Sequence, residues 1–348
     1  MTGRLLKRER SGLVRAAVVR SFVIGILATL VFGVALYHPF FQSRVLSRMP
    51  FLWTLILFLY WVVPLPLYLL TFLRHPERRY DSGSKPLLVL ALVRRLRRGG
   101  WHGIRPAFRS FHARLTLLSL LVKLYYLPLM TSFFWEHTTF IVGWFQRSPS
   151  LSSFTLQDWV LGSGYSLVNQ TIFLIDTMIF AFGYAVELPW LKSRIRSVEP
   201  TLLGWTVTLA CYPPFNMATD VVLSRKYANV VLPDLFRATL NIGVLTCLLI
   251  YLWASIALWF KASNLTHRGI VAHGPYRFIR HPAYAAKNLS WWLESLPSLT
   301  NPSNILSIVG WNVIYILRAI TEERHLKKDP AYREYCRKVR YRFIPGVV

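Results

Sequence analysis

Long hydrophobic runs alternate with short basic segments along the whole chain. A helix needs about 20 apolar residues to cross the hydrocarbon core of a bilayer, and most of these runs reach that length. The pattern predicts an all-α fold, a polytopic membrane bundle of about eight transmembrane helices. The predicted spans are residues 17–37, 51–72, 115–135, 168–188, 201–223, 238–260, 285–300 and 303–321.

Proline residues mark predicted irregularities in these spans. The prolines within residues 64–66 predict a kink in the second span, and Pro213-Pro214 break the fifth, which is the weakest. Such breaks are tolerated in membranes when neighbouring helices satisfy the freed carbonyl groups. The segment 297–302 is rich in Ser, Asn and Pro, which predicts a turn that joins the last two spans into a hairpin.

The charge distribution indicates a membrane protein and argues against binding to nucleic acid. The formal net charge is +26 and 54% of the residues are hydrophobic, a combination that is rare in soluble domains. The basic residues fall between the spans, and no nucleic-acid recognition motif accompanies them. We therefore expect a multi-pass protein with both termini and the basic loop 73–114 on the cytoplasmic side. Within this loop, residues 86–98 predict an amphipathic helix on the membrane face or, alternatively, a solvated loop.

Lys123 and Asp176 are ionisable residues near the middle of predicted spans, whereas the sequence gives no sign of a metal site. Lys123 is either functional or extends its ammonium towards the interface, and Asp176 either pairs with Lys123 or lines a cavity. The three cysteines show no metal spacing. His267, His273 and His281 form a loose cluster that is more typical of loop and pocket residues than of zinc ligands.

A polar segment between the sixth and seventh spans is the strongest candidate for a functional site. It runs from His273 to Tyr284, and the acidic pair Glu322-Glu323 follows at the end of the last span. Gly and Pro residues predict an irregular backbone in this segment. Polar groups clustered at a membrane boundary need partners or a polar ligand, so this segment predicts a site on the same side as the tail.

The residue types in this segment suit a ligand with several kinds of polar group. Arg280 offers a planar fork for a carboxylate or phosphate. Glu322 and Glu323 accept hydrogen bonds from an ammonium or a sugar diol, and Tyr276 and Tyr284 offer ring faces to a cation or an adenine. S-adenosylmethionine carries all of these groups, and a pyridine dinucleotide carries some of them. Alternatively, Arg280 pairs with one of the two glutamates and pins the ends of the hairpin.

The C-terminal quarter of the chain, about residues 260–348, resembles a known enzyme family. The residues that carry the resemblance are Gly274-Pro275-Tyr276, Arg280-His281-Pro282-Ala283-Tyr284, Glu322-Glu323, Tyr332, Tyr335 and Arg342-Phe343-Ile344-Pro345. Together they look like the isoprenylcysteine carboxyl methyltransferase family, a group that also includes phospholipid N-methyltransferases. Members usually carry Gly two residues after the second Tyr of the motif, where this chain has Ala286.

The resemblance implies an integral membrane enzyme that uses S-adenosylmethionine in a cytosol-facing pocket. It divides the chain into an N-terminal bundle, residues 1–260, and a cofactor-binding region, residues 261–348. We assign Arg280, His281 and Glu322 to the chemistry. The residues expected to bind the cofactor are His273, Gly274, Pro275, Tyr276, Arg280, His281, Pro282, Tyr284, Glu322, Glu323 and Arg340.

The expected acceptor is a lipid or a lipid-linked molecule that reaches the site from the bilayer. A carboxylate acceptor, which we favour, needs no base, whereas an amine acceptor must first lose a proton. Two other functions compete with methyl transfer. The tail 339–345 also resembles the membrane sterol reductases, which bind NADPH, although Glu322-Glu323 fits the methyltransferases better. The other alternative is a non-catalytic scaffold whose basic loop binds anionic lipid.

Overall fold

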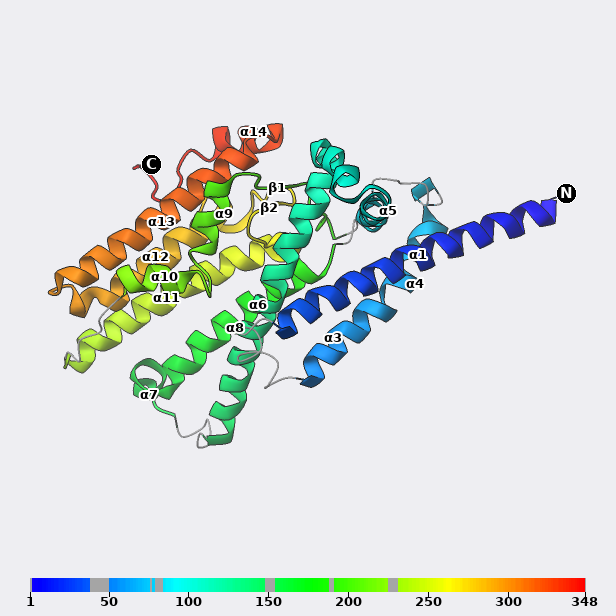
Figure 1. Ribbon diagram of the computed structural model, residues 1–348. Helices are drawn as coiled ribbons and strands as arrows, with labels where there is room; N and C mark the ends of the chain where they lie inside the picture. The colour runs from blue at the N-terminus through cyan, green and yellow to red at the C-terminus, as the bar shows by residue number, and fades with distance from the viewer. Residues whose placement is uncertain are drawn as a thin grey trace. The chain divides into compact units, whose positions relative to one another are not determined.

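The computed structural model describes residues 2–37, 50–75, 77–78, 84–147, 154–187, 191–224 and 231–347 (Figure 1). Regular structure in these ranges is helical except for one pair of two-residue strands. Six helical segments of the described chain are long and apolar enough to cross a membrane. The predicted all-α polytopic fold is therefore confirmed. The chain divides into two compact units, Met1–Pro128 and Leu129–Val348, whereas the predicted functional division after residue 260 stays a prediction.

The first unit is built around one long helix. Helix α1 (Thr2–Tyr37) packs on α3 (Pro50–Val62), α4 (Pro64–Arg74) and α5 (Lys85–Ile104). The turn η3 (Arg105–Arg109) leads to α6 (Phe111–Arg147), which begins in this unit. The predicted kink of the second span lies where α3 ends and α4 begins at Pro64, and the stretch predicted as an amphipathic helix is helical within α5.

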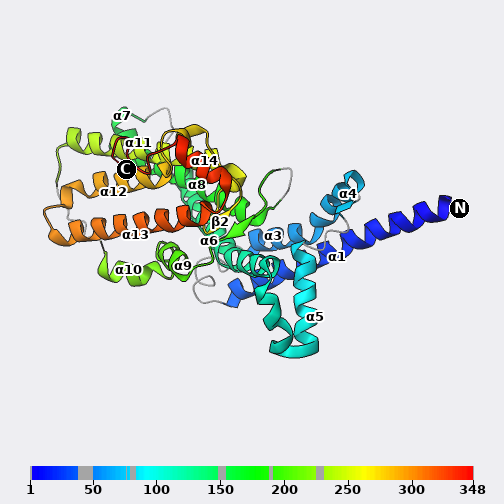
Figure 2. The same cartoon turned by 90° about the horizontal axis from the view of Figure 1, so that it is seen from above.

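The second unit holds the whole polar segment and the residues that contact it. Figure 2 shows its helices α11, α12 and α13 lying side by side. Its elements after α6 are α7 (Leu156–Leu161), α8 (Ser163–Ala185), β1 (Ser197–Val198), α9 (Leu202–Leu209), α10 (Asn216–Val222), α11 (Asp234–Leu258), η5 (Trp259–Lys261), β2 (Thr266–His267), η6 (Gly274–Arg277), α12 (Pro282–Ser295), η7 (Leu296–Ser298), α13 (Pro302–Leu326) and α14 (Pro330–Lys338).

Helix α11 is the central helix of this unit and packs on both α8 and α12. Its apolar contact with α8 is a cluster of Ile172, Val244, Leu248 and Leu252. The predicted mid-span carboxylate Asp176 lies on the same side of α8, where it accepts hydrogen bonds from hydroxyl groups of α11. A buried polar group in an apolar bundle must be satisfied in this way, so Asp176 links the two helices.

Two of the predicted spans do not form one continuous helix of bilayer-spanning length. The span 201–223 consists of α9 and α10, with eight and seven residues, which Pro213-Pro214 separate because proline lacks the N–H group that would continue the helix. The span 285–300 is α12, with 14 residues, followed by η7. Both lie below the length of about 20 residues that a spanning helix needs.

Short backbone pairings hold the polar segment against the rest of the unit. Strand β1 pairs antiparallel with β2, so that Ser197 lies opposite His267. The amides of Arg280 and His281 donate to the carbonyl oxygens of Tyr341 and Arg342 at 2.9 Å each. The C-terminal tail therefore closes over the predicted motif, and β1 brings the end of the 189–200 segment to the same place.

Candidate active site

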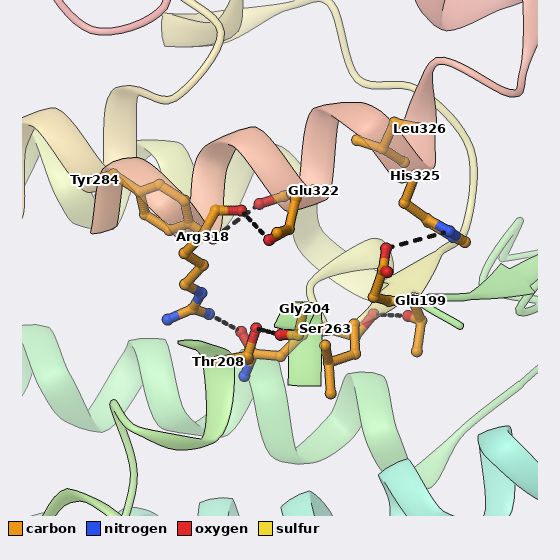
Figure 3. Close-up of a pocket in the computed structure, with 13 residues that line it drawn as sticks. Glu199, Gly204, Thr208, Ser263, Tyr284, Arg318, Glu322, His325 and Leu326 are labelled. Carbon is orange, nitrogen blue, oxygen red and sulfur yellow. Dashed lines mark hydrogen bonds and ion pairs between the residues drawn. The ribbon is translucent and has the colours of Figure 1, made fainter. Parts of the chain in front are cut away.

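A small polar cavity opens between α9, the loop before β2 and helix α13 (Figure 3). Its volume is about 40 Å³, which is room for a few water molecules. A nucleotide-sized ligand needs a pocket of about 300 Å³ or more, so it would have to displace side chains here. The lining residues are Glu199, Gly204, Thr208, Ser263, Asn264, Leu265, Thr266, Tyr284, Arg318, Thr321, Glu322, His325 and Leu326.

Arg318 is the cation of this cavity, and its guanidinium is held among tyrosine rings. The side chain is 6% exposed. Its Cζ atom lies 5.1 Å from the ring centre of Tyr284 and 5.7 Å from those of Tyr212 and Tyr315. It also donates a hydrogen bond to Oδ1 of Asn264. A delocalised guanidinium is weakly hydrated and stacks well on ring faces, which explains how a charge can stay inside this bundle.

Glu322 lies one helical turn after Arg318 and lines the same cavity. Its Oε2 accepts a hydrogen bond of 2.8 Å from the hydroxyl of Tyr284, the last tyrosine of the polar motif. The glutamate side chain is otherwise exposed. The two helices of the hairpin, α12 and α13, therefore each contribute one polar group to the same wall of the cavity.

A second carboxylate, Glu199, faces the cavity from the segment between β1 and α9. It is 3% exposed and accepts a hydrogen bond from the backbone amide of Thr201. Arg324 and His325 lie 3.4 and 3.6 Å from its oxygens. Gly204 makes room for it, since a Cβ atom there would overlap the glutamate side chain. Its Oε2 accepts no hydrogen bond from any described residue, which suits an ammonium or hydroxyl donor of a ligand.

Glu323 points to the other side of α13 and forms a buried ion-pair cluster. It is 1% exposed, and its oxygens lie 3.2 Å from Arg280 Nε and 3.3 Å from His281 Nε2. Arg342 donates two hydrogen bonds to it at 3.0 and 3.1 Å, and the Lys327 ammonium lies 3.4 Å away. The hydrogen bonds to Glu323 raise the pKa of the Arg342 guanidinium above its usual value. The cluster ties the polar segment, α13 and the tail together.

The predicted site residues therefore fall into groups. Tyr284 and Glu322 line the cavity, whereas Arg280, His281 and Glu323 form the neighbouring cluster. One alternative from the sequence was that Arg280 pairs with a glutamate at the end of the hairpin. The structure shows this pair, and the glutamate is Glu323. The cofactor contacts of Arg280 and His281 stay a prediction.

Most of the remaining predicted residues lie in the loop that leads to Arg280. Gly274 has a φ of +61°, which favours glycine, and opens η6. The carbonyl of Tyr276 accepts a hydrogen bond of 2.6 Å from the hydroxyl of Tyr335 on α14. Pro275 is buried in η6 and Pro282 begins α12. His273 and Arg340 are exposed, and Ala286 is buried within α12.

Sequence reasoning missed several residues of the cavity: Glu199, Thr208, Asn264, Arg318 and His325. Arg318 could have been found, because a charged residue inside an apolar run is the signal that singled out Lys123. Glu199 gave no comparable signal. It reaches the cavity only because β1 pairs with β2, a contact between segments about 70 residues apart.

We expect the stability of the second unit to fall on acidification because of His267. This residue is 4% exposed, and burial lowers the pKa of its imidazole from 6.5 to about 4, with further lowering by His325, Arg196 and Lys261 and an opposing effect of Asp329. The unfolded chain therefore takes up this proton first as the pH falls. Stability is therefore highest above pH 6.5 and falls between pH 6.5 and 4, by on the order of 3 kcal/mol.

The measurement is thermal unfolding of the protein in detergent between pH 7.5 and 4.5. His267→Gln should flatten this pH dependence, whereas His102→Gln, at an exposed position of α5, should leave it unchanged. A dependence that His267→Gln does not alter would assign the acid sensitivity to other groups.

The fold and the cavity together define a class of protein. Six helical segments of the described chain are long and apolar enough to cross a bilayer, and one of them, α13, lines a cavity with two carboxylates and a buried arginine. This is therefore an integral membrane protein with a polar site in its helical bundle. Residues 237–333, which run from α11 into α14, match the family model for phospholipid methyltransferases. The predicted resemblance is confirmed for this part of the chain. The searches of curated proteins and of solved structures found no match.

The family match indicates a membrane methyltransferase. It includes the polar motif, both glutamates of α13 and Arg318, and leaves out Glu199 and α9, which lie before it in the chain. The match does not favour a sterol reductase or a lipid-binding scaffold, the two alternatives that the sequence left open.

Proposed function

We propose that this protein transfers a methyl group from S-adenosylmethionine to a lipid or lipid-linked acceptor. The observation that carries the proposal is the composition of the cavity, which Arg318, Glu322 and Glu199 line together. The carboxylates would accept hydrogen bonds from the ammonium or the ribose hydroxyls of this cofactor. Arg318 would bind its carboxylate, and the ring of Tyr284 would face its positive sulfur.

The same composition argues against a pyridine dinucleotide. Its phosphates would meet two carboxylates, Glu199 and Glu322, and only one arginine in this cavity, and like charges repel one another. A sulfonium cofactor carries positive charge to the same place and is attracted. The two carboxylates therefore favour S-adenosylmethionine over NADPH.

The bound cofactor would supply an electrophilic methyl group. This chain would align the acceptor atom with that group and keep water away from it. The acceptor oxygen or nitrogen would form the new bond to carbon while the carbon–sulfur bond breaks and its electron pair stays on sulfur. A carboxylate acceptor would need no base. An amine acceptor would first lose a proton, and Glu322 is better placed to take it than His281, which is buried against Glu323.

The side of the membrane follows from charge. By the positive-inside rule, both termini, the basic loop 73–114 and the polar motif would lie on the cytoplasmic side. The lipid acceptor would reach the cavity from the bilayer, between the helices of the second unit. The cofactor-binding region proposed from the sequence, residues 261–348, would use α9 and Glu199 as an additional wall.

Calorimetric titration of the purified protein in detergent tests this proposal. We expect saturable binding of S-adenosylmethionine and about tenfold weaker binding to Glu322→Gln, which corresponds to about 1.4 kcal/mol. Glu334→Gln is the matched control, because Glu334 is exposed and pairs with Lys338 on α14. Binding of NADPH alone would instead support a reductase, and binding of neither nucleotide would support the scaffold.

A further inference from the structure

A lysine inside the helical bundle, Lys287, takes no part in the cavity described above. It lies on α12 one turn after Tyr284, on the same face of the helix. Its Nζ lies over three ring faces, at 5.9 Å from Phe173 on α8, 5.4 Å from Tyr251 on α11 and 5.7 Å from Trp291 on α12. The side chain is partly exposed. An ammonium in this setting is costly and commonly marks a site.

The carboxylate that acts most strongly on Lys287, Asp176, is already hydrogen-bonded to other side chains. Asp176 interacts electrostatically with Lys287, but among the described residues no carboxylate lies within ion-pair distance of the ammonium. The oxygens of Asp176 accept hydrogen bonds from Tyr251 at 2.7 Å and from Ser255 at 2.5 Å. Ring faces supply only part of the attraction that a carboxylate would. Lys287 therefore retains capacity to bind an anion.

A second cation, Arg318, is connected to Lys287 through contacts between aromatic rings. The ring of Trp291, which faces Lys287, lies 5.4 Å from the ring of Tyr315, and Tyr315 in turn contacts Arg318 in the cavity. Aromatic rings therefore lie between the two cations, and Asp176 is hydrogen-bonded to side chains of α11. This surrounding favours an anionic group next to the proposed methyl-transfer site.

We propose that Lys287 binds an oxyanion of the acceptor head group, either a phosphate or a carboxylate. The reacting atom of that acceptor faces the cavity lined by Tyr284 and Arg318. This inference rests on the proposed function, because it names the acceptor of the same site. It also explains why a lysine lies between aromatic rings, although a phenylalanine or leucine would have a lower free-energy cost of burial there.

Lipid binding to the full-length protein tests this assignment, by native mass spectrometry in detergent. The probes are phosphatidylethanolamine, which carries a phosphate, oleate, which carries a carboxylate, and diacylglycerol, which carries neither. We expect the wild-type protein to bind one of the first two at least tenfold more tightly than diacylglycerol. Lys287→Met should abolish this preference, and Lys287→Arg should keep it. Whichever of the two lipids loses affinity identifies the oxyanion.

The control is Lys338→Met, at an exposed position on α14, which should bind all three lipids as the wild type does. A wild type without preference, or a Lys287→Met variant that keeps it, would overturn the assignment. So would a Lys287→Met variant whose only defect is a lower unfolding temperature, since Lys287 would then be a purely structural partner of Asp176. Titration with S-adenosylmethionine reports separately on the proposed function: its failure with lipid preference intact would refute only the methyl donor.

Discussion

Replacing Glu323 by glutamine is expected to lower the free energy of unfolding by about 3–5 kcal/mol, because it leaves buried cations without their anion. The carboxylate is 1% exposed and lies within 3.4 Å of Arg280, His281, Arg342 and Lys327. The glutamine keeps the shape of the side chain and removes its charge. Thermal unfolding in detergent measures the effect, and we expect the tail after α13 to become sensitive to protease first.

The neighbouring glutamate supplies the matched control. Glu322→Gln changes the same residue type on the same helix, but its side chain is exposed and bonded to one hydroxyl. We expect its effect on stability to stay below about 1 kcal/mol. Equal destabilisation by the two variants would show that Glu323 is not the centre of the cluster.

Arg318→Lys is expected to weaken binding of S-adenosylmethionine about 100-fold, or about 2.7 kcal/mol. The guanidinium contacts the rings of Tyr212, Tyr284 and Tyr315 and donates to Asn264. Lysine keeps the charge but has neither the planar fork that pairs with a carboxylate nor the stacking face. Calorimetric titration measures the loss, and incorporation of labelled methyl groups into lipid should fall with it.

Arg333→Lys is the control for this variant, because Arg333 is exposed on α14. Circular dichroism and the unfolding temperature separate a binding defect from misfolding. Unchanged cofactor affinity in a folded Arg318→Lys protein would show that this arginine only supports the packing of α13 against α9.

The two glutamates of α13 also explain how the cavity and the cluster coexist. Consecutive residues of a helix point about 100° apart, so Glu322 faces the cavity and Glu323 faces the tail. The cluster fixes the position of the motif loop, and the loop in turn leads into α12, which places Tyr284 beside Glu322. We therefore expect Glu323 to act as a positioning residue for the proposed cofactor site.

The helical membrane architecture was readable from local sequence, because hydrophobicity over about 20 residues decides whether a helix is stable in lipid. The break at Pro64 followed from the same local reasoning and agrees with α3 and α4. For residues 86–98 that reasoning left a helix and a solvated loop open, and the structure shows the helix within α5. The motif that resembles the methyltransferases was also local, and the family match extends from α11 to α14.

Contacts between distant segments were beyond that reasoning. The pairing of β1 with β2 brings Glu199 to the cavity, and the fold, not the sequence, selected Glu323 as the partner of Arg280. The fifth and seventh predicted spans are short helices whose length depends on proline and on packing partners. Hydrophobic pattern reports the free energy of one segment in lipid, whereas a site depends on which segments pack together, and that is a property of the whole unit.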